Sequence, residues 1–107
     1  MADALTFNNG FNAAPIAYQQ ITVTNTAIGI SAPTKTGANA AMLQVEAAQI
    51  RWRDDGTDPT ASVGMLMSPG DPPFPYSGNL SAIKFIRVSA TSGTLNASLY
   101  SIGEAGK

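Results

Sequence analysis

Residues 49–60 read Gln-Ile-Arg-Trp-Arg-Asp-Asp-Gly-Thr-Asp-Pro-Thr. Apolar Ile50 and Trp52 alternate with polar neighbours, which is the period of a half-buried β-strand. The residues that follow favour a turn, because Asp side chains bond local backbone groups and Gly accepts a positive φ. A strand that stops at such a turn predicts an antiparallel β-protein.

The same alternation recurs in other parts of the chain. Apolar and polar residues alternate, or short apolar runs occur, in segments 20–24, 28–30, 63–67, 82–88 and 95–100. Clusters of Gly, Pro, Asp and Asn separate these segments and favour turns. Seven or eight short strands at a spacing of about 8–12 residues are typical of a sandwich or small barrel. We therefore predict an all-β fold, an antiparallel β-sandwich, and no helix.

Residues 40–48 read AAMLQVEAA, which is rich in good helix formers. We nevertheless predict one strand, or two joined strands, over residues 41–53, because the apolar residues keep period two. These apolar positions are odd-numbered in the first half of the segment and even-numbered in the second half. A single core face would need one extra residue, so we predict a β-bulge near Ala47-Ala48.

The N-terminal segment has no regular period. Leu5, Phe7 and Phe11 lie among Asn, Gly and Ala, with a turn expected between the two aromatic residues. We divide the chain into an extended N-terminal arm, residues 1–16, and a β-sandwich domain, residues 17–107. Two interpretations of the arm stay open. It is either a frayed terminus or a segment that docks its apolar residues on a neighbouring subunit.

Composition argues against an enzyme. The 107 residues include no His and no Cys, so the commonest general base, the commonest metal ligand and thiolate chemistry are missing. No catalytic or cofactor-binding motif replaces them, and we predict no enzymatic activity and no cofactor. Six basic and seven acidic residues give no basic excess, which argues against nucleic acid as a partner.

Low charge points instead to association. Charged residues make up 12 % of the chain, against about 25 % in a typical soluble domain. A weakly charged surface favours association, so we expect much of it to be covered in the working state. The first ten residues lack the basic and apolar regions of a secretory signal. No window approaches the roughly 18 apolar residues of a membrane span, and we expect no membrane contact.

Arg51 and Arg53 flank Trp52, and strand geometry puts the arginines on one face and the tryptophan on the other. We expect Trp52 in the core. The arginines are expected either to pair with Glu46 or with a carboxylate of a neighbouring subunit, or to stay solvated. A nucleic-acid base stacked on Trp52 beside the arginines would need all three side chains on one face, which this geometry opposes.

Two other groups of residues suggest binding sites. Asp54, Asp55 and Asp58 offer oxygen ligands for calcium, but their spacing does not match an EF-hand, so we predict turn capping and no metal site. Phe74 and Tyr76 lie near four of the seven prolines, in a stretch that can be neither a helix nor a central strand. If exposed, the two rings would form a glycan-binding platform; if buried, they would close one end of the sandwich.

Residues 45–66 read VEAAQIRWRDDGTDPTASVGML, with Gly70-Asp71 and Ile83-Lys84-Phe85-Ile86 downstream. This pattern resembles small virion structural proteins of tailed bacteriophages. Those chains show a strand that ends in an Ile-Arg-Trp/Phe-Arg-like stretch, then an Asp-Gly-x-x-Pro-Thr turn, then a strand and a Gly-Asp turn. The resemblance covers roughly residues 17 to 102.

The resemblance implies a capsid cement or decoration protein with a jelly-roll-like sandwich. Such a protein would be made in the host cytoplasm and sit on the capsid surface of the virion. Its partners would be the major capsid protein and itself, as a homo-oligomer with a trimer favoured over a dimer. The alternative is a receptor- or glycan-binding module of a phage head or tail fibre.

The resemblance supplies no catalytic residue. The motif residues that it covers are expected to be structural, namely Trp52, Gly56, Pro59, Thr60 and Gly64. The residues that we expect at an interface are Leu5, Phe7, Phe11, Arg51 and Arg53.

Overall fold

The computed structural model describes residues 5–7, 11–31 and 37–104, and the side chains of residues 14–31 and 37–102. Every regular element in these ranges is a β-strand. The strands are β1 (Leu5–Phe7), β2 (Phe11–Val23), β3 (Ile28–Gly29), β4 (Ala40–Glu46), β5 (Ile50–Arg53), β6 (Met65–Met67), β7 (Phe74–Tyr76), β8 (Lys84–Arg87) and β9 (Gly93–Glu104). The predicted all-β fold is confirmed. A search of the described segments for a helix able to cross a membrane found none.

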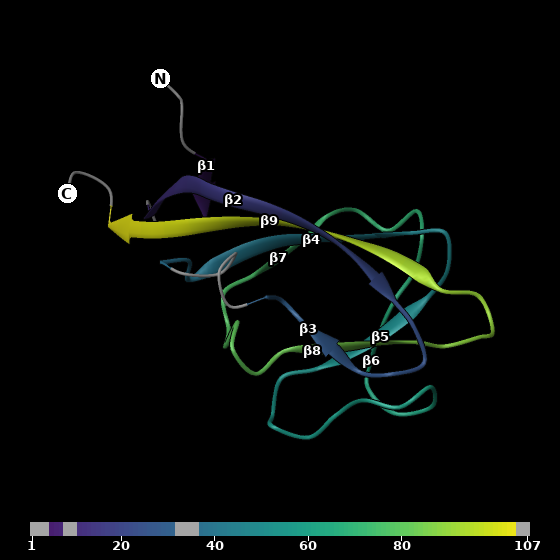
Figure 1. Cartoon of the computed structure of the whole chain (residues 1–107). Coiled ribbons are helices and arrows are strands. Elements are labelled where there is room, and N and C mark those ends of the chain that lie inside the picture. The colour runs from purple at the N-terminus through teal and green to yellow at the C-terminus, as the bar shows by residue number, and fades with distance from the viewer. Residues whose placement is uncertain (1–4, 8–10, 32–36, 105–107) are drawn as a thin grey trace.

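The strands form two antiparallel sheets (Figure 1). One sheet has five strands in the order β1-β2-β9-β4-β7, and the other has four strands in the order β3-β8-β5-β6. Two of these strands were not expected from the sequence. β1 lies in the segment predicted to be an arm, and β7 is an edge strand within the proline-rich stretch, where Pro75 is tolerated.

The hydrophobic core lies between the two sheets. Leu43 of β4 and Leu95 of β9 face it from the five-stranded sheet, and Ile50 of β5 and Phe85 of β8 face it from the four-stranded sheet. All four side chains are fully buried. Burying a side chain of this size stabilises the fold by about 1.5–3 kcal/mol. The apolar residues that alternate in the sequence therefore form one inward face on each sheet.

β2 and β9 are the longest strands and pair from Phe11 opposite Glu104 to Val23 opposite Gly93. Their register shifts between Pro15 and Ala17, so one irregularity lies within the strand. The boundary predicted after residue 16 falls inside β2. Both strands exceed the short strands that we predicted. The added part of β2 has no regular apolar period in the sequence, and its pairing with β9 extends the strand.

The predicted bulge at Ala47-Ala48 is wrong. Instead, the chain leaves the five-stranded sheet after Glu46 and enters the four-stranded sheet at Ile50. The Ala48 N–H donates to the Glu46 carbonyl oxygen at 2.9 Å, and Ala47 has a φ of 75°, which together define a tight γ-turn. The apolar positions change parity because each half of the segment faces the core from a different sheet.

Candidate functional site

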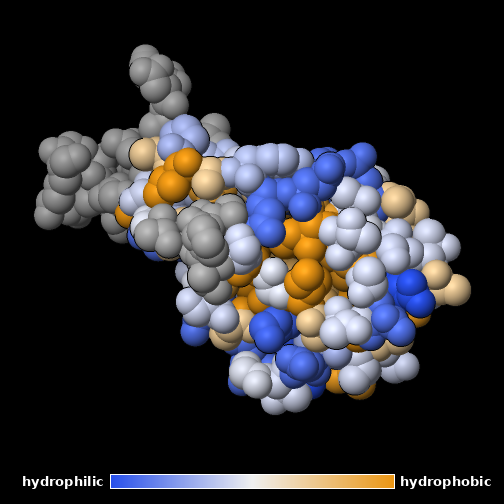
Figure 2. Space-filling view, viewed as in Figure 1, coloured by the Kyte–Doolittle hydropathy of each residue, from blue (hydrophilic) through white to orange (hydrophobic). Residues whose placement is uncertain are grey.

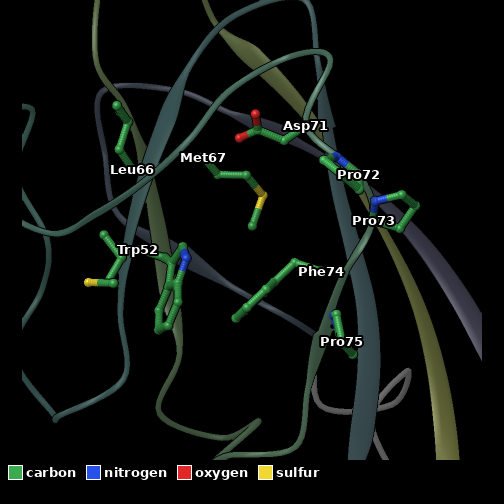
Figure 3. A pocket seen from close by; sticks show the side chains of 9 residues that line it. Trp52, Leu66, Met67, Asp71, Pro72, Pro73, Phe74 and Pro75 are labelled. Carbon is green, nitrogen blue, oxygen red and sulfur yellow. The ribbon is translucent and has the colours of Figure 1, made fainter. Parts of the chain in front are cut away.

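An apolar groove opens between the edge strands β6 and β7, one from each sheet. Its volume is about 390 Å³. One wall comes from β5 and β6, namely Trp52, Met65, Leu66 and Met67. The other wall comes from β7 and the turn before it, namely Asp71, Pro72, Pro73, Phe74 and Pro75. Figure 3 shows that Trp52, Met67 and Phe74 point toward one another across the groove.

Trp52 and Phe74 line this groove, and the ring of Tyr76 packs against Trp52 behind it. The ring centroids of Trp52 and Phe74 lie 5.8 Å apart with a tilt of 34°, and those of Trp52 and Tyr76 lie 5.7 Å apart edge to face. Such arrangements are favoured by the quadrupoles of the rings. Trp52 also packs against the core cluster while remaining partly exposed. The tryptophan predicted for the core therefore lies at its border and forms part of the groove.

A hydrogen bond links the two sheets behind the rings. The Tyr76 hydroxyl, on β7, donates to Oδ2 of Asp54, just after β5, at 2.6 Å. Tyr76 is 6 % exposed. Burial, the bond to Asp54 and its charge together raise the pKa of the Tyr76 phenol well above its ordinary value, since all three favour the neutral form. This contact holds the aromatic end of the groove in place.

The segment between β5 and β6 packs back on β5. Arg51 donates from Nε to the Ala61 carbonyl at 3.1 Å and from Nη1 to the Gly64 carbonyl at 2.9 Å. Gly64 has a φ of 142°, and a Cβ there would lie 3.1 Å from the Trp52 carbonyl oxygen. Only glycine fits this backbone without strain. These contacts set where β6 begins.

The other motif residues lie in the same segment. Gly56 has a φ of 90° at an open turn, and Pro59 is buried beneath Gly64. The Thr60 amide donates to the Val63 carbonyl at 2.9 Å, and its hydroxyl oxygen accepts from the Val63 amide at 3.0 Å. This pair of bonds closes a local turn. The structure thus gathers the motif around the strand pair that forms one wall of the groove.

Large apolar side chains are exposed in the groove and beside it. Exposed fractions are 60 % for Met65, 49 % for Leu66, 51 % for Val63 and 39 % for Phe74. Successive residues of a strand point to opposite faces, so β6 exposes an apolar side chain on each of its faces. Exposed apolar side chains gathered around a groove are typical of an interaction site.

A second hollow continues the groove past Trp52 and Met65 to the residues after β5. It is lined there by Arg53, Asp54 and Asp55. Arg53 forms a two-pronged ion pair with Asp55, which raises the pKa of the arginine and lowers that of the aspartate through hydrogen bonding first. Asp54 and Asp71 have no cation within ion-pair distance among the described residues.

The predicted interface residues lie on both sheets. Leu5, Phe7 and Phe11 belong to β1 and β2 of the five-stranded sheet, and Arg51 and Arg53 belong to β5 of the other. Arg51 bonds to backbone carbonyls and Arg53 bonds to Asp55. Glu46, one of the partners considered for the arginines, instead accepts a hydrogen bond from Asn96 at 2.6 Å, so neither arginine takes that alternative. Glu46 lies at the end of β4, and the arginines lie on β5 of the other sheet. The side chains of Leu5, Phe7 and Phe11 lie outside the described part of the chain.

Each of the acidic residues considered for calcium has a different partner. Asp54 accepts from Tyr76, Asp55 pairs with Arg53, and Asp58 lies 3.8 Å from Lys84. Within the described ranges no three acidic, His or Cys residues form a group that could hold a metal ion. Asp55 also accepts from the Thr57 amide, a bond within the turn itself.

The sequence pointed to Phe74 and Tyr76 but missed their neighbours in the groove. Met65 and Leu66 were assigned to a short apolar strand with no sign that both would be exposed. The sequence carried no signal for this exposure, because an unbroken apolar run such as Gly-Met-Leu-Met is the pattern of a strand buried on both faces.

The opposite open side of the molecule lies between β2 and β3. Figure 2 shows hydrophobic residues in the middle of that face. Ile28 of β3 is exposed there by the same 39 % as Phe74 in the groove. It therefore offers a matched position for tests of the groove.

Comparison of the chain with protein-family models, with curated proteins and with solved structures gave no match.

Proposed function

We propose that this chain is a capsid cement or decoration protein of a tailed bacteriophage. It binds the outside of the major capsid lattice as a homo-oligomer, with a trimer favoured, and stabilises the head. The observation that most favours a docking role is the apolar groove between β6 and β7, whose rim leaves Met65 60 % exposed. The phage assignment is supported by the sequence pattern of residues 45–66.

The strand pairing supports a jelly-roll sandwich as the finer form of the fold. With β1 set aside, the first strand pairs with the last and each next strand with the next from the end, namely β2 with β9, β3 with β8, β4 with β7 and β5 with β6. This order results when one long antiparallel hairpin rolls up. The roll adds the pairs β4–β9 and β5–β8. Jelly rolls recur in viral capsid and lectin domains.

The surface chemistry supports attachment through many modest contacts. Net charge is −1 with 12 % charged residues, so little electrostatic repulsion opposes close packing of copies. An oligomer that straddles several capsid subunits multiplies weak contacts through effective concentration. Affinity of that kind needs an apolar docking surface on each copy, which the groove supplies.

The glycan-binding alternative is less well supported. A sugar platform needs exposed ring faces, whereas Tyr76 is 6 % exposed and bonded to Asp54. Phe74 remains partly exposed but leans on Trp52. One ring alone does not form the two-ring platform.

Electron microscopy of virions tests the proposal. Gold-labelled antibody against the chain should decorate the outside of mature heads of the virus whose genome encodes it. Heads assembled without the chain should release DNA at a lower temperature, and adding purified chain back should restore the higher temperature. Absence of the chain from the mature head surface would overturn the proposal. A hit on a glycan array, together with label on fibres, would favour the alternative.

A further inference from the structure

We propose that the groove between β6 and β7 binds an extended peptide segment of the partner protein, in which basic residues flank apolar ones, by adding it as a strand to the edge of β6. This inference rests on the proposed docking function and names the chemistry of what docks. Three features support it. They are an open strand edge, acidic side chains in and beside an apolar groove, and an indole N–H that donates no hydrogen bond within the described residues.

The open edge supplies backbone hydrogen bonds. β6 pairs with β5 alone among the described strands, and its outer edge makes no backbone hydrogen bond to the rest of the described chain. Alternate N–H and C=O groups of such an edge point outward and can accept a further strand. Natural edges are commonly protected by charge or Pro, yet β6 reads Met-Leu-Met. A strand added here would lie along the mouth of the groove.

The charges select the flanking residues of the peptide. The groove and the adjoining hollow are lined by three carboxylates, of Asp54, Asp55 and Asp71, and by one guanidinium, of Arg53. Their sum is −3 + 1 = −2. Asp55 is neutralised by Arg53. Asp71 in the groove and Asp54 in the adjoining hollow have no cation within ion-pair distance among the described residues, and each accepts one hydrogen bond, from the Ser68 amide and the Tyr76 hydroxyl respectively. Basic side chains on either side of an apolar residue match this pattern.

Trp52 supplies a polar contact inside the apolar stretch. Its indole N–H donates no hydrogen bond within the described residues, and its nitrogen lies on the side of the ring that faces Met67 and Phe74 (Figure 3). A peptide carbonyl in the groove would accept this bond. Pockets with apolar walls and one fixed polar group bind and orient a ligand in this way.

Synthetic peptides test the inference on the full chain. The probe is a fluorescent nine-residue peptide of alternating Lys and Val or Leu, used as a small set with the order of Val and Leu varied. We expect saturable binding by anisotropy, with amide shifts at Met65–Met67 and at the Trp52 indole in NMR spectra. The same peptide with Glu in place of Lys should bind at least about ten-fold more weakly, a difference of about 1.4 kcal/mol.

Variants and a modified peptide separate the groove from other surfaces. Phe74→Ala should weaken binding about ten-fold or more, as loss of an aromatic anchor does. Ile28→Ala, at equal exposure on the other side of the molecule, should leave binding unchanged. A peptide N-methylated along one edge cannot add as a strand and should lose binding, although its charge and apolar residues are unchanged.

Each contrary outcome overturns the inference. These outcomes are no binding by any Lys peptide, equal binding by the Glu or N-methylated peptides, and equal effects of Phe74→Ala and Ile28→Ala. Self-association that buries Met65–Met67, or a sugar that shifts the Trp52 indole, would assign the groove to another occupant. The proposed function is judged separately. If antibody finds the chain on heads but no peptide binds, the proposed function stands and the peptide site is rejected. If peptide binds but heads carry no label, the peptide site stands and the capsid function is rejected.

Discussion

The Tyr76 hydroxyl donates a 2.6 Å hydrogen bond to Oδ2 of Asp54. The two residues are 22 positions apart, one on the edge strand of the five-stranded sheet and the other just after a strand of the four-stranded sheet. The bond therefore ties the sheets together on their open side, beside the tilted ring pair of Trp52 and Phe74. The bond lies next to Trp52, which lines the groove between β6 and β7.

Tyr76 makes the fold sensitive to alkaline pH. Burial and the hydrogen bond to Asp54 raise its pKa in the folded chain above the ordinary value of 10.0, so the folded state keeps a proton that the unfolded state releases. The stabilisation is complete below about pH 10 and is lost as pH rises from there toward the folded pKa, with a slope of about 1.4 kcal/mol per pH unit. Urea titrations between about pH 8 and 11 measure it.

Tyr76→Phe is the control for this slope. The variant removes a hydrogen bond to a carboxylate and should cost about 1–2 kcal/mol at neutral pH. Its stability should fall less steeply than wild type above about pH 10, because this titrating group is gone. Parallel slopes for the two proteins would contradict the assignment to Tyr76.

Gly64→Ala should destabilise the chain by about 2–4 kcal/mol. The added Cβ would lie 3.1 Å from both the Arg51 Cβ and the Trp52 carbonyl oxygen, at a φ of 142°. Gly56→Ala is the matched control, because Gly56 has a φ of 90° but open space around it, and should cost only about 1–2 kcal/mol. Thermal unfolding of the two variants separates crowding from backbone strain, and equal losses would show that crowding at Gly64 is unimportant.

Ala47→Gly should stabilise the chain by about 0.5–1 kcal/mol. Ala47 has a φ of 75°, a conformation that costs an alanine about 1–2 kcal/mol. Glycine removes this strain, but its larger conformational entropy in the unfolded chain offsets part of the gain. Ala48→Gly, at the next position and without a positive φ, should instead destabilise by about 0.5–1 kcal/mol. Chemical denaturation checks both signs. Destabilisation by both changes would argue against the γ-turn.

Arg51→Met should loosen the segment that leads into β6. The two bonds to the Ala61 and Gly64 carbonyls are lost, so amide exchange over residues 54–64 should speed up while β9 stays protected. Arg53→Met is the companion variant, since Arg53 bonds to exposed Asp55 rather than to the segment's backbone. Its exchange pattern should match wild type, and equal loosening in both variants would refute a specific role of Arg51.

Much of the strand content followed from sequence, since alternation reports directly whether one face of a segment is buried. The proline-rich stretch was recognised as unable to form a central strand, and β7 is an edge strand. Helix propensity over residues 40–48 was correctly overruled by the alternating pattern. The change of parity near Ala47 was seen as well, but a bulge and a crossing between sheets leave the same mark on a sequence.

The candidate site was only partly predictable for the same reason. Trp52 and Phe74 were each singled out, yet nothing local indicated that they stack. The exposure of Met65 and Leu66 was missed, because an edge position and a buried position carry the same apolar residues.

Local pattern was enough to determine most of the strands and turns, although not β1 or β7, because these depend on backbone geometry and on burial of one residue in two. The pairing of strands, the crossing at Ala47 and the meeting of Trp52, Phe74 and Tyr76 were settled by the packing of the two sheets. Which edges lie together depends on contacts between residues far apart in the chain, and the groove between β6 and β7 exists only once both sheets are in place.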